Sequence, residues 1–228
     1  IRRVVAVRFV SRRNVLQSLG GVAASGSLTG LLGAALGSLH SPAHAGAQKE
    51  EHMVDSVRTA LSAAISNSAP PIPHFTDAKS QREYQYWLTT MSARIGNRMV
   101  DELSRQEFLQ TVWYEAARAG LEISLVLGLI QVESNFRKYA ISYAGARGLM
   151  QVMPFWARVI GDGDAGKLFH MQTNLRFGCS ILRHYLHREG GNMYMALGRY
   201  NGSRGQPQYP NAVFAAQKRW LMPNETLP

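Results

Sequence analysis

The most constraining feature of the sequence is an apolar run that ends in a carboxylate. Residues 125–132 read Leu-Val-Leu-Gly-Leu-Ile-Gln-Val, and Glu133 follows them directly. Leu125, Leu129 and Glu133 are four residues apart, so a helix places all three on one face. A face this apolar is expected to pack into the core. The sequence therefore predicts that Glu133 is a buried carboxylate.

A carboxylate in that position has two explanations. Burial disfavours its charged form and raises its pKa, and the negative end of the helix dipole acts in the same direction. A raised pKa lets a carboxyl group act as a general acid near neutral pH. The structural alternative is a buried ion pair with Arg137, which lies four residues further on.

Helical spacing of apolar residues recurs along the chain, and no convincing alternating strand is present. Ser104 with Glu107 forms a capping-box pattern, Gly120 is placed to end the helix that follows, and Ser124 is expected to cap the next one. The expected helices span approximately residues 48–66, 78–101, 104–119, 125–135, 155–160, 173–187, 193–200 and 211–220. The fold is therefore predicted to be mainly α-helical.

The composition is that of a chain with a packed core. Apolar residues make up 46% of the sequence and charged residues 18%, which is unlike a disordered chain. Cys179 is the single cysteine, so the chain forms no internal disulfide and no cysteine-based metal cluster. Its neighbours Phe177, Ile181 and Leu182 indicate a small buried hydrophobe and not a reactive thiol.

Residues 1–45 have the organisation of an export signal. Five arginines come first, and no Lys, Arg, Asp or Glu occurs from Asn14 to Leu39. Ala43-His44-Ala45 has the small-x-small pattern of a signal peptidase site, so cleavage is expected after Ala45. No cysteine stands at this point, so a lipid anchor is not expected.

The segment Ser11-Arg12-Arg13-Asn14-Val15-Leu16 resembles the twin-arginine motif of the Tat pathway, which exports proteins after they have folded. The alternative is an ordinary Sec signal with two adjacent arginines. Either signal predicts a periplasmic protein.

The charge balance limits the possible partners. The chain has 25 Lys and Arg against 15 Asp and Glu, and 20 against 15 remain after residue 45. A modest basic excess suits a nucleic acid, an anionic membrane surface or an acidic polymer such as the cell wall. Export from the cytoplasm and the lack of a basic run after residue 45 argue against nucleic acid.

Three motifs follow one another in the second half of the sequence. They are Glu133-Ser134, the run Gly-Ala-Arg-Gly-Leu-Met-Gln-Val-Met-Pro at residues 145–154, and Tyr200-Asn201-Gly202. In order and spacing they closely resemble the motifs of the soluble lytic transglycosylase family, which is related in fold to goose-type lysozyme. The resemblance covers approximately residues 106–220 and implies a lysozyme-like helical domain.

Three regions are expected along the chain. Residues 1–45 are expected to form the Tat-type signal peptide. Residues 46–103 are expected to form an N-terminal helical extension with a proline-containing linker, and residues 104–222 the lytic transglycosylase catalytic domain.

The resemblance also implies an activity. In the family, the glutamate that Glu133 matches protonates the oxygen linking N-acetylmuramic acid to N-acetylglucosamine. It then removes a proton from the muramoyl C6 hydroxyl, which attacks C1 and gives a 1,6-anhydro sugar. No water or second carboxylate is needed, in contrast to the usual glycosidase mechanism with two carboxylates.

The implied partners are the glycan strands of peptidoglycan. The sequence indicates no cofactor and no particular envelope protein as partner.

Six further residues are expected at the substrate site from the resemblance: Ser134, Ser142, Met150, Gln151, Tyr200 and Asn201. The hydroxyl of Ser134 or Ser142 would bind the N-acetyl group or orient the C6 hydroxyl, although Ser142 also suits a plain turn. Met150 would form an apolar wall and Gln151 would hydrogen-bond sugar. Tyr200 matches a tyrosine whose hydroxyl contacts the catalytic carboxylate, and Asn201 matches a neighbouring amide.

Arg199, which precedes Tyr200, is either a cation near the substrate's peptide or part of a solvated helix face.

No metal site is expected. Residues 162–166 read Asp-Gly-Asp-Ala-Gly, but Gly166 and Thr173 stand where a calcium loop needs oxygen-bearing and carboxylate side chains.

Two alternative functions stay open beside the transglycosylase. The first is a lysozyme-type hydrolase, which would require a second carboxylate that is not evident in the motifs. The second is an inactive peptidoglycan-binding scaffold, and the joint presence of Glu133, Gln151 and Tyr200 argues against it.

Overall fold

The computed structural model describes residues 48–51, 53, 55–66, 73 and 75–223, so the expected signal peptide lies outside the described residues. The α-helices are α1 (Asp55–Ser66), α2 (Ala78–Ile95), α3 (Glu102–Ala119), α4 (Ile123–Ser134), α5 (Phe155–Ile160), α6 (Met171–Arg188), α7 (Met193–Asn201) and α8 (Gln208–Gln217). Two 3-10 helices, η1 (Ala165–Phe169) and η2 (Lys218–Trp220), complete them. The described residues contain no strand, so the prediction of a mainly α fold is confirmed.

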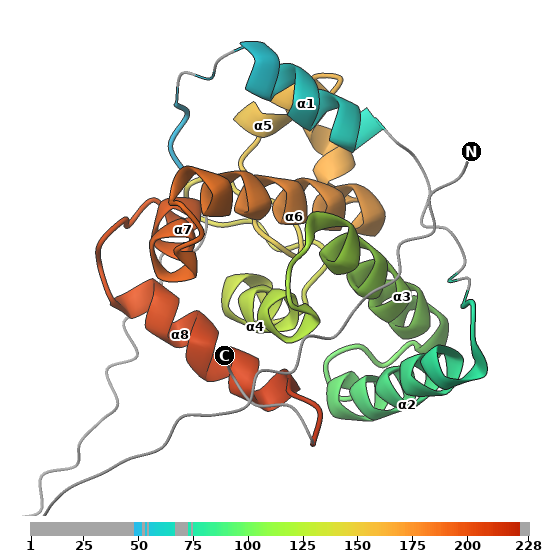
Figure 1. Ribbon diagram of the computed structural model, residues 1–228. Helices are drawn as coiled ribbons and strands as arrows, with labels where there is room; N and C mark the ends of the chain where they lie inside the picture. The colour runs from blue at the N-terminus through green and yellow to red at the C-terminus, as the bar shows by residue number, and fades with distance from the viewer. Residues whose placement is uncertain (1–47, 52, 54, 67–72, 74, 224–228) are drawn as a thin grey trace, which may run out of the picture. The chain divides into compact units, whose positions relative to one another are not determined.

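Helix α4 lies among the other helices of the described residues. Figure 1 shows it surrounded by α3, α6 and α8, and its apolar residues from Leu125 to Ile130 are almost fully buried. Helix α8 runs antiparallel beside it, because Gln217 contacts Ser124 at one end of α4 while Tyr209 contacts Glu133 at the other.

Gly128 allows this close approach of α4 and α8. A Cβ atom at residue 128 would lie 2.7 Å from the backbone nitrogen of Gln217 and 2.9 Å from its Cα. Because these are backbone atoms, no side-chain rotation would relieve the overlap. The missing side chain of Gly128 therefore sets the distance between the two helices.

A buried ion-pair cluster joins α3 to α6. The Glu115 carboxylate is fully buried and accepts hydrogen bonds from Arg176 and Arg118, each at 2.8 Å. Arg118 also donates to Ser180 on α6. A buried charge is tolerated only when its partners satisfy it, so this cluster fixes the register of the two helices.

Helix α2 packs against the body of the protein through an aromatic cluster, as its apolar spacing predicts. Tyr84 and Trp87 are buried and lie 5.0 and 4.8 Å, between ring centroids, from Trp113 on α3. Further along α2, Met91 and Ile95 are completely buried.

Several helix starts differ from the sequence prediction. The cap of α3 is Asp101, whose carboxylate accepts from the Ser104 backbone nitrogen, so the helix begins earlier than a capping box at Ser104 predicts. Ser124 does not cap α4, which begins at Ile123; its hydroxyl accepts a hydrogen bond from Gln217. Residues 48–51 have no regular secondary structure, and the first helix begins only at Asp55. The cap at Asp101 is a local contact, whereas the hydroxyl of Ser124 is used by a residue distant in sequence.

The buried position expected for Cys179 is confirmed, since its side chain is completely enclosed and burial raises the pKa of its thiol.

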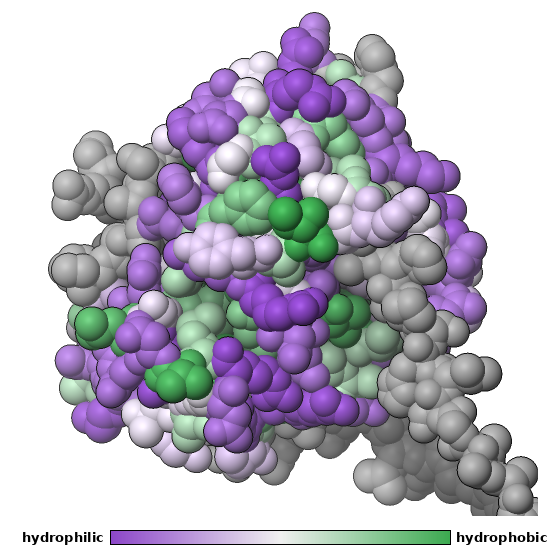
Figure 2. Space-filling view, turned by 180° about the vertical axis from the view of Figure 1, so that it is seen from behind, coloured by the Kyte–Doolittle hydropathy of each residue, from purple (hydrophilic) through white to green (hydrophobic). Residues whose placement is uncertain are grey.

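On the face shown in Figure 2, apolar side chains lie interspersed with polar ones. Within the described ranges, no helix combines the length and the hydropathy needed to cross a membrane.

The close approach at Gly128 gives a prediction. Gly128→Ala should destabilise the protein by about 1–3 kcal/mol through overpacking, although alanine is the better helix former. Gly96→Ala is the matched control: its φ is −51°, and a Cβ there would lie no closer than 3.5 Å to its neighbours. Urea unfolding of both variants measures the difference, and equal midpoints would contradict the role of Gly128.

Candidate active site

Glu133 lies in the last turn of α4 and is 5% exposed. Its Oε1 accepts a hydrogen bond of 2.5 Å from the hydroxyl of Tyr209 on α8. Its Oε2 is buried and has no hydrogen-bond partner among the described residues. A carboxylic acid carries one proton, and Oε1 already accepts from Tyr209. The geometry therefore leaves Oε2 as the proton-bearing oxygen.

The surroundings of Glu133 favour its protonated form. Burial raises the pKa of Glu133 from the ordinary 4.5 to about 8, and the hydrogen bond from Tyr209 opposes this rise. Burial disfavours the charged carboxylate, whereas a donor on Oε1 stabilises it. The side chain is therefore mostly protonated at neutral pH, and Tyr209 is placed to stabilise it after the proton leaves.

The alternative in which Glu133 pairs with Arg137 is not what the structure has. The Arg137 guanidinium donates to the backbone oxygen of Ser134, and no ion pair involves Glu133 in the part of the chain that the structure describes.

The glycine-rich segment is fastened to α6 by Asn174. The Asn174 side chain accepts from the backbone nitrogen of Met150 and donates to the carbonyl oxygens of Arg147 and Leu168, with distances of 2.7–2.8 Å. Gly148 has φ of +77°, and a Cβ there would lie 2.3 Å from the Asn174 side chain. Glycine is thus required at this position both for the turn and for the close approach.

Ser134 and Gln151 form part of the frame around the carboxyl group. The buried Ser134 hydroxyl donates to the carbonyl oxygen of Leu149 at 2.7 Å, so it ties the end of α4 to the glycine-rich segment. The Gln151 amide nitrogen donates to the carbonyl oxygens of Gly148 and Ala140. These bonds hold Gln151 in a left-handed conformation with φ of +49°.

Met150 and Tyr200 are also deeper than the sequence suggests. Met150 is completely buried, with its side chain against Gly178 of α6, so it does not form an exposed cleft wall. The Tyr200 hydroxyl donates to the carbonyl oxygen of Met150 at 2.8 Å. The contact with the carboxylate that was expected of Tyr200 is made by Tyr209, because α8 and not α7 lies alongside α4.

Asn201 and Ser142 keep hydrogen-bonding capacity. Asn201 donates to Ser203, while its side-chain oxygen is buried without a partner in the described part of the chain. Ser142 is half-buried in a turn, and its hydroxyl oxygen accepts from the backbone nitrogen of Ala146 at 3.1 Å. Because that bond does not use the hydroxyl proton, Ser142 is able both to stabilise the turn and to donate a hydrogen bond to a substrate.

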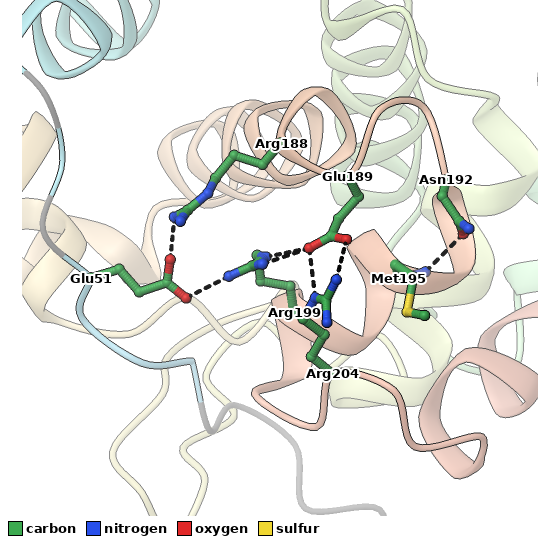
Figure 3. Close-up of polar contacts among 7 residues, drawn as sticks. All are labelled: Glu51, Arg188, Glu189, Asn192, Met195, Arg199 and Arg204. Atoms are coloured by element: carbon green, nitrogen blue, oxygen red, sulfur yellow. Dashed lines mark hydrogen bonds and ion pairs between the residues drawn. The ribbon is translucent and has the colours of Figure 1, made fainter.

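Arg199 is engaged in ion pairs. Its guanidinium contacts Glu51 at 2.8 Å and Glu189 at 2.6 Å, and Glu189 also pairs with Arg204 (Figure 3). The side chain of Arg199 is only 19% exposed. It is therefore neither a free cation for substrate nor part of a solvated face, because two carboxylates already neutralise it.

Tyr209 and Asn174 were not identified from the sequence. A signal for Tyr209 does exist: Tyr209, Val213 and Gln217 recur every four residues and are all buried on one face of α8. The expected helix began two residues too late to include Tyr209. Asn174 gives no such signal, because an asparagine in a helix is ordinarily a surface residue.

The raised pKa of Glu133 predicts a pH dependence of stability. Between pH 4.5 and about 8 the unfolded chain has lost a proton that the folded protein keeps. This contribution to the free energy of unfolding therefore falls through that window, by up to about 5 kcal/mol, and levels off above it. Glu133→Gln should remove this fall.

The measurement is urea unfolding of both proteins from pH 5 to 9. His184, whose pKa burial lowers, is present in both proteins and contributes equally to them, so the difference between them isolates Glu133. Tyr209→Phe removes the bond that lowers the pKa of Glu133 and should extend the fall to higher pH. Parallel curves for wild type and Glu133→Gln would show that Glu133 titrates normally.

Comparison with known proteins identifies the domain that carries this site. The family model described as transglycosylase SLT domain matches residues 111–222. Membrane-bound lytic murein transglycosylase C of Actinobacillus pleuropneumoniae is 38% identical in an alignment of 121 residues that covers 46% of this chain and 33% of the relative. The protein of the same name from Histophilus somni is 52% identical in an alignment of 85 residues that covers 34% of this chain and 23% of the relative. The chain thus matches a third or less of the length of these relatives.

Among solved structures, the 70 kDa soluble lytic transglycosylase of Escherichia coli aligns with a TM-score of 0.43 and 20% identity, over 63% of this chain and 29% of that one. The segment that the family model matches contains Glu133, the glycine-rich segment and Tyr209. Residues 111–222 of this chain therefore belong to the transglycosylase SLT family.

Proposed function

We propose that the chain is a peptidoglycan lytic transglycosylase that cleaves the β-1,4 bond between N-acetylmuramic acid and N-acetylglucosamine without consuming water. The observation that carries the proposal is the Glu133 carboxyl group, which is buried, mostly protonated at neutral pH, and leaves Oε2 without a partner. The relatives named as lytic murein transglycosylases support the same class of reaction.

The first step is proton donation. Glu133 Oε2 gives its proton to the glycosidic oxygen as the bond to C1 of the muramoyl residue breaks, which is general acid catalysis. The carboxylate left behind is stabilised by the Tyr209 hydroxyl on Oε1. Because burial makes this charge unfavourable, the carboxylate is a strong base in the next step.

The second step returns the proton. The carboxylate removes the proton of the muramoyl C6 hydroxyl, and the C6 oxygen bonds to C1, which gives the 1,6-anhydro sugar. Glu133 ends as it began, protonated. Ser142 and Asn201, which keep unused hydrogen-bonding capacity, bind the N-acetyl and hydroxyl groups of the sugar. Ser134, Gln151, Met150 and Tyr200 hold the surrounding backbone.

A lysozyme-type hydrolase is the second candidate, and the electrostatics disfavour it. A second carboxylate in the cleft would raise the pKa of Glu133 by repulsion. Only burial and Tyr209 act on it among the described residues. The other deeply buried glutamate, Glu115, is neutralised by two arginines. Attack by the substrate's own C6 hydroxyl requires only one carboxyl group, and Glu133 is such a group because it forms no ion pair.

Mass spectrometry of digested peptidoglycan tests the proposal. The full chain should release muropeptides that end in 1,6-anhydromuramic acid, and Glu133→Gln should lower their rate of release by about 10²–10⁴-fold. Glu107→Gln, which changes an exposed glutamate on α3, is the control and should be fully active. Products with reducing ends would identify a hydrolase, and no Glu133-dependent product would favour a binding scaffold.

The proposal includes export to the periplasm by the Tat pathway, supported by Arg12-Arg13 and by the small-x-small site before Gly46. Replacing Arg12 and Arg13 together with lysine should abolish accumulation in the periplasm, measured by cell fractionation and immunoblotting. Unchanged accumulation of the double variant would favour the Sec pathway.

A further inference from the structure

The N-terminal strap, defined as residues 48–51 and 53, lies against the helices that surround the site. It has no regular secondary structure, and it precedes the segment matched by the transglycosylase SLT domain by about 60 residues. Figure 3 shows Glu51 of the strap reaching toward Arg188 on α6 and Arg199 on α7. A segment far away in sequence thus contacts two helices of the catalytic domain.

Gln48 is the buried end of the strap. It is 4% exposed, and its side-chain oxygen accepts from the indole nitrogen of Trp156 at 3.0 Å and from the backbone nitrogen of Met153 at 3.4 Å. Gln48 also lies near the Tyr200 hydroxyl, whose pKa burial raises and Gln48 lowers, but the side-chain nitrogen of Gln48 is buried without a hydrogen-bond partner among the described residues. The hydrogen bonds of Gln48 therefore connect the strap to α5 and to the end of the glycine-rich segment.

Glu51 ties the strap to the last turn of α7. One carboxylate oxygen accepts from Arg199 at 2.8 Å, and the other pairs with Arg188. Arg199 directly precedes Tyr200, and its other contact is Glu189 at the end of α6. These groups are partly buried, with side-chain exposures of 32% for Glu51 and 19% for Arg199. Such pairs are screened less than pairs on an open surface.

Tyr200 carries the connection to the catalytic carboxyl group. Its hydroxyl holds the carbonyl oxygen of Met150, next to Gln151. Tyr200 is also close enough to Glu133 for the charge of that carboxylate to raise the pKa of Tyr200. Movement at the end of α7 would therefore displace the glycine-rich segment and admit water to Glu133.

We propose that two residues of the strap, Gln48 and Glu51, are positioning residues, which together hold the end of α7 against the glycine-rich segment and keep water away from Glu133. This inference rests on the proposed transglycosylase activity. It extends the working unit of the enzyme beyond the segment that the family model covers.

Steady-state kinetics on soluble peptidoglycan strands of defined length test the proposal, with the full chain throughout. Gln48→Ala should lower kcat about tenfold or more while KM stays within about twofold, because misplacement of reacting groups affects the transition state more than binding. Glu51→Gln should lower kcat in the same direction. Glu50→Gln is the matched control, since Glu50 pairs only at 3.6 Å with exposed Arg158.

The pH profile separates positioning from simple loss of stability. Water admitted by Gln48→Ala should lower the pKa of Glu133 and move the alkaline limb of kcat about one unit to lower pH. The groups facing Glu133 and Tyr200 are Tyr209, Tyr185 and Cys179; burial raises all their pKa values, so they remain neutral in this range. The pKa of Glu133 alone therefore determines the position of the alkaline limb of kcat.

Two results would overturn the inference. Gln48→Ala and Glu51→Gln could match Glu50→Gln in kcat, or they could lose activity only in proportion to a fall in Tm, with the alkaline limb unmoved. If Gln48→Ala does not fold, Glu51→Gln decides through both kcat and the pH profile. Failure of the proposed function itself is distinguishable, because the wild-type chain would then release no Glu133-dependent products.

Discussion

The hydrogen bond between Tyr209 and Glu133 is the interaction on which the site depends, because it joins two helices that are distant in sequence at a buried carboxyl group. Burial and this bond act on the pKa of Glu133 in opposite directions. The balance leaves a proton available near neutral pH and a donor ready for the charge that follows its loss. Both effects require α4 and α8 to be in close contact, which the missing side chain of Gly128 permits.

Around this pair, polar side chains serve mainly to fix backbone. Ser134, Asn174 and Tyr200 each bond to main-chain atoms of residues 147–150. A loop so close to a buried carboxyl group has few water molecules to satisfy its own carbonyl and amide groups, so side chains take that place. Ser134 and Tyr200, which the sequence suggested for the substrate site, therefore hold the backbone of this segment in place.

The sequence predicted what local spacing determines. The apolar periodicity located α4 through α8 to within a few residues, and it placed Glu133 on a buried face. It did not predict partners that only tertiary packing selects: Tyr209 for the carboxyl group, Asn174 for the glycine-rich segment, and Gln48 for Trp156. The start of α3 was misplaced for a local reason, because the Asp101 carboxylate and not the Ser104 hydroxyl caps the helix.

The bond from Ser134 to Leu149 has a consequence for partly opened states of the protein. Ser134 adjoins Glu133, so a fluctuation that detaches the glycine-rich segment also loosens the end of α4. In such a state the carboxyl group meets solvent, its pKa returns toward that of an ordinary glutamate, and it ionises at neutral pH. A copy of the chain that is incompletely folded thus has no proton to donate, so the defect that exposes the carboxyl group also removes the proton that the proposed reaction requires.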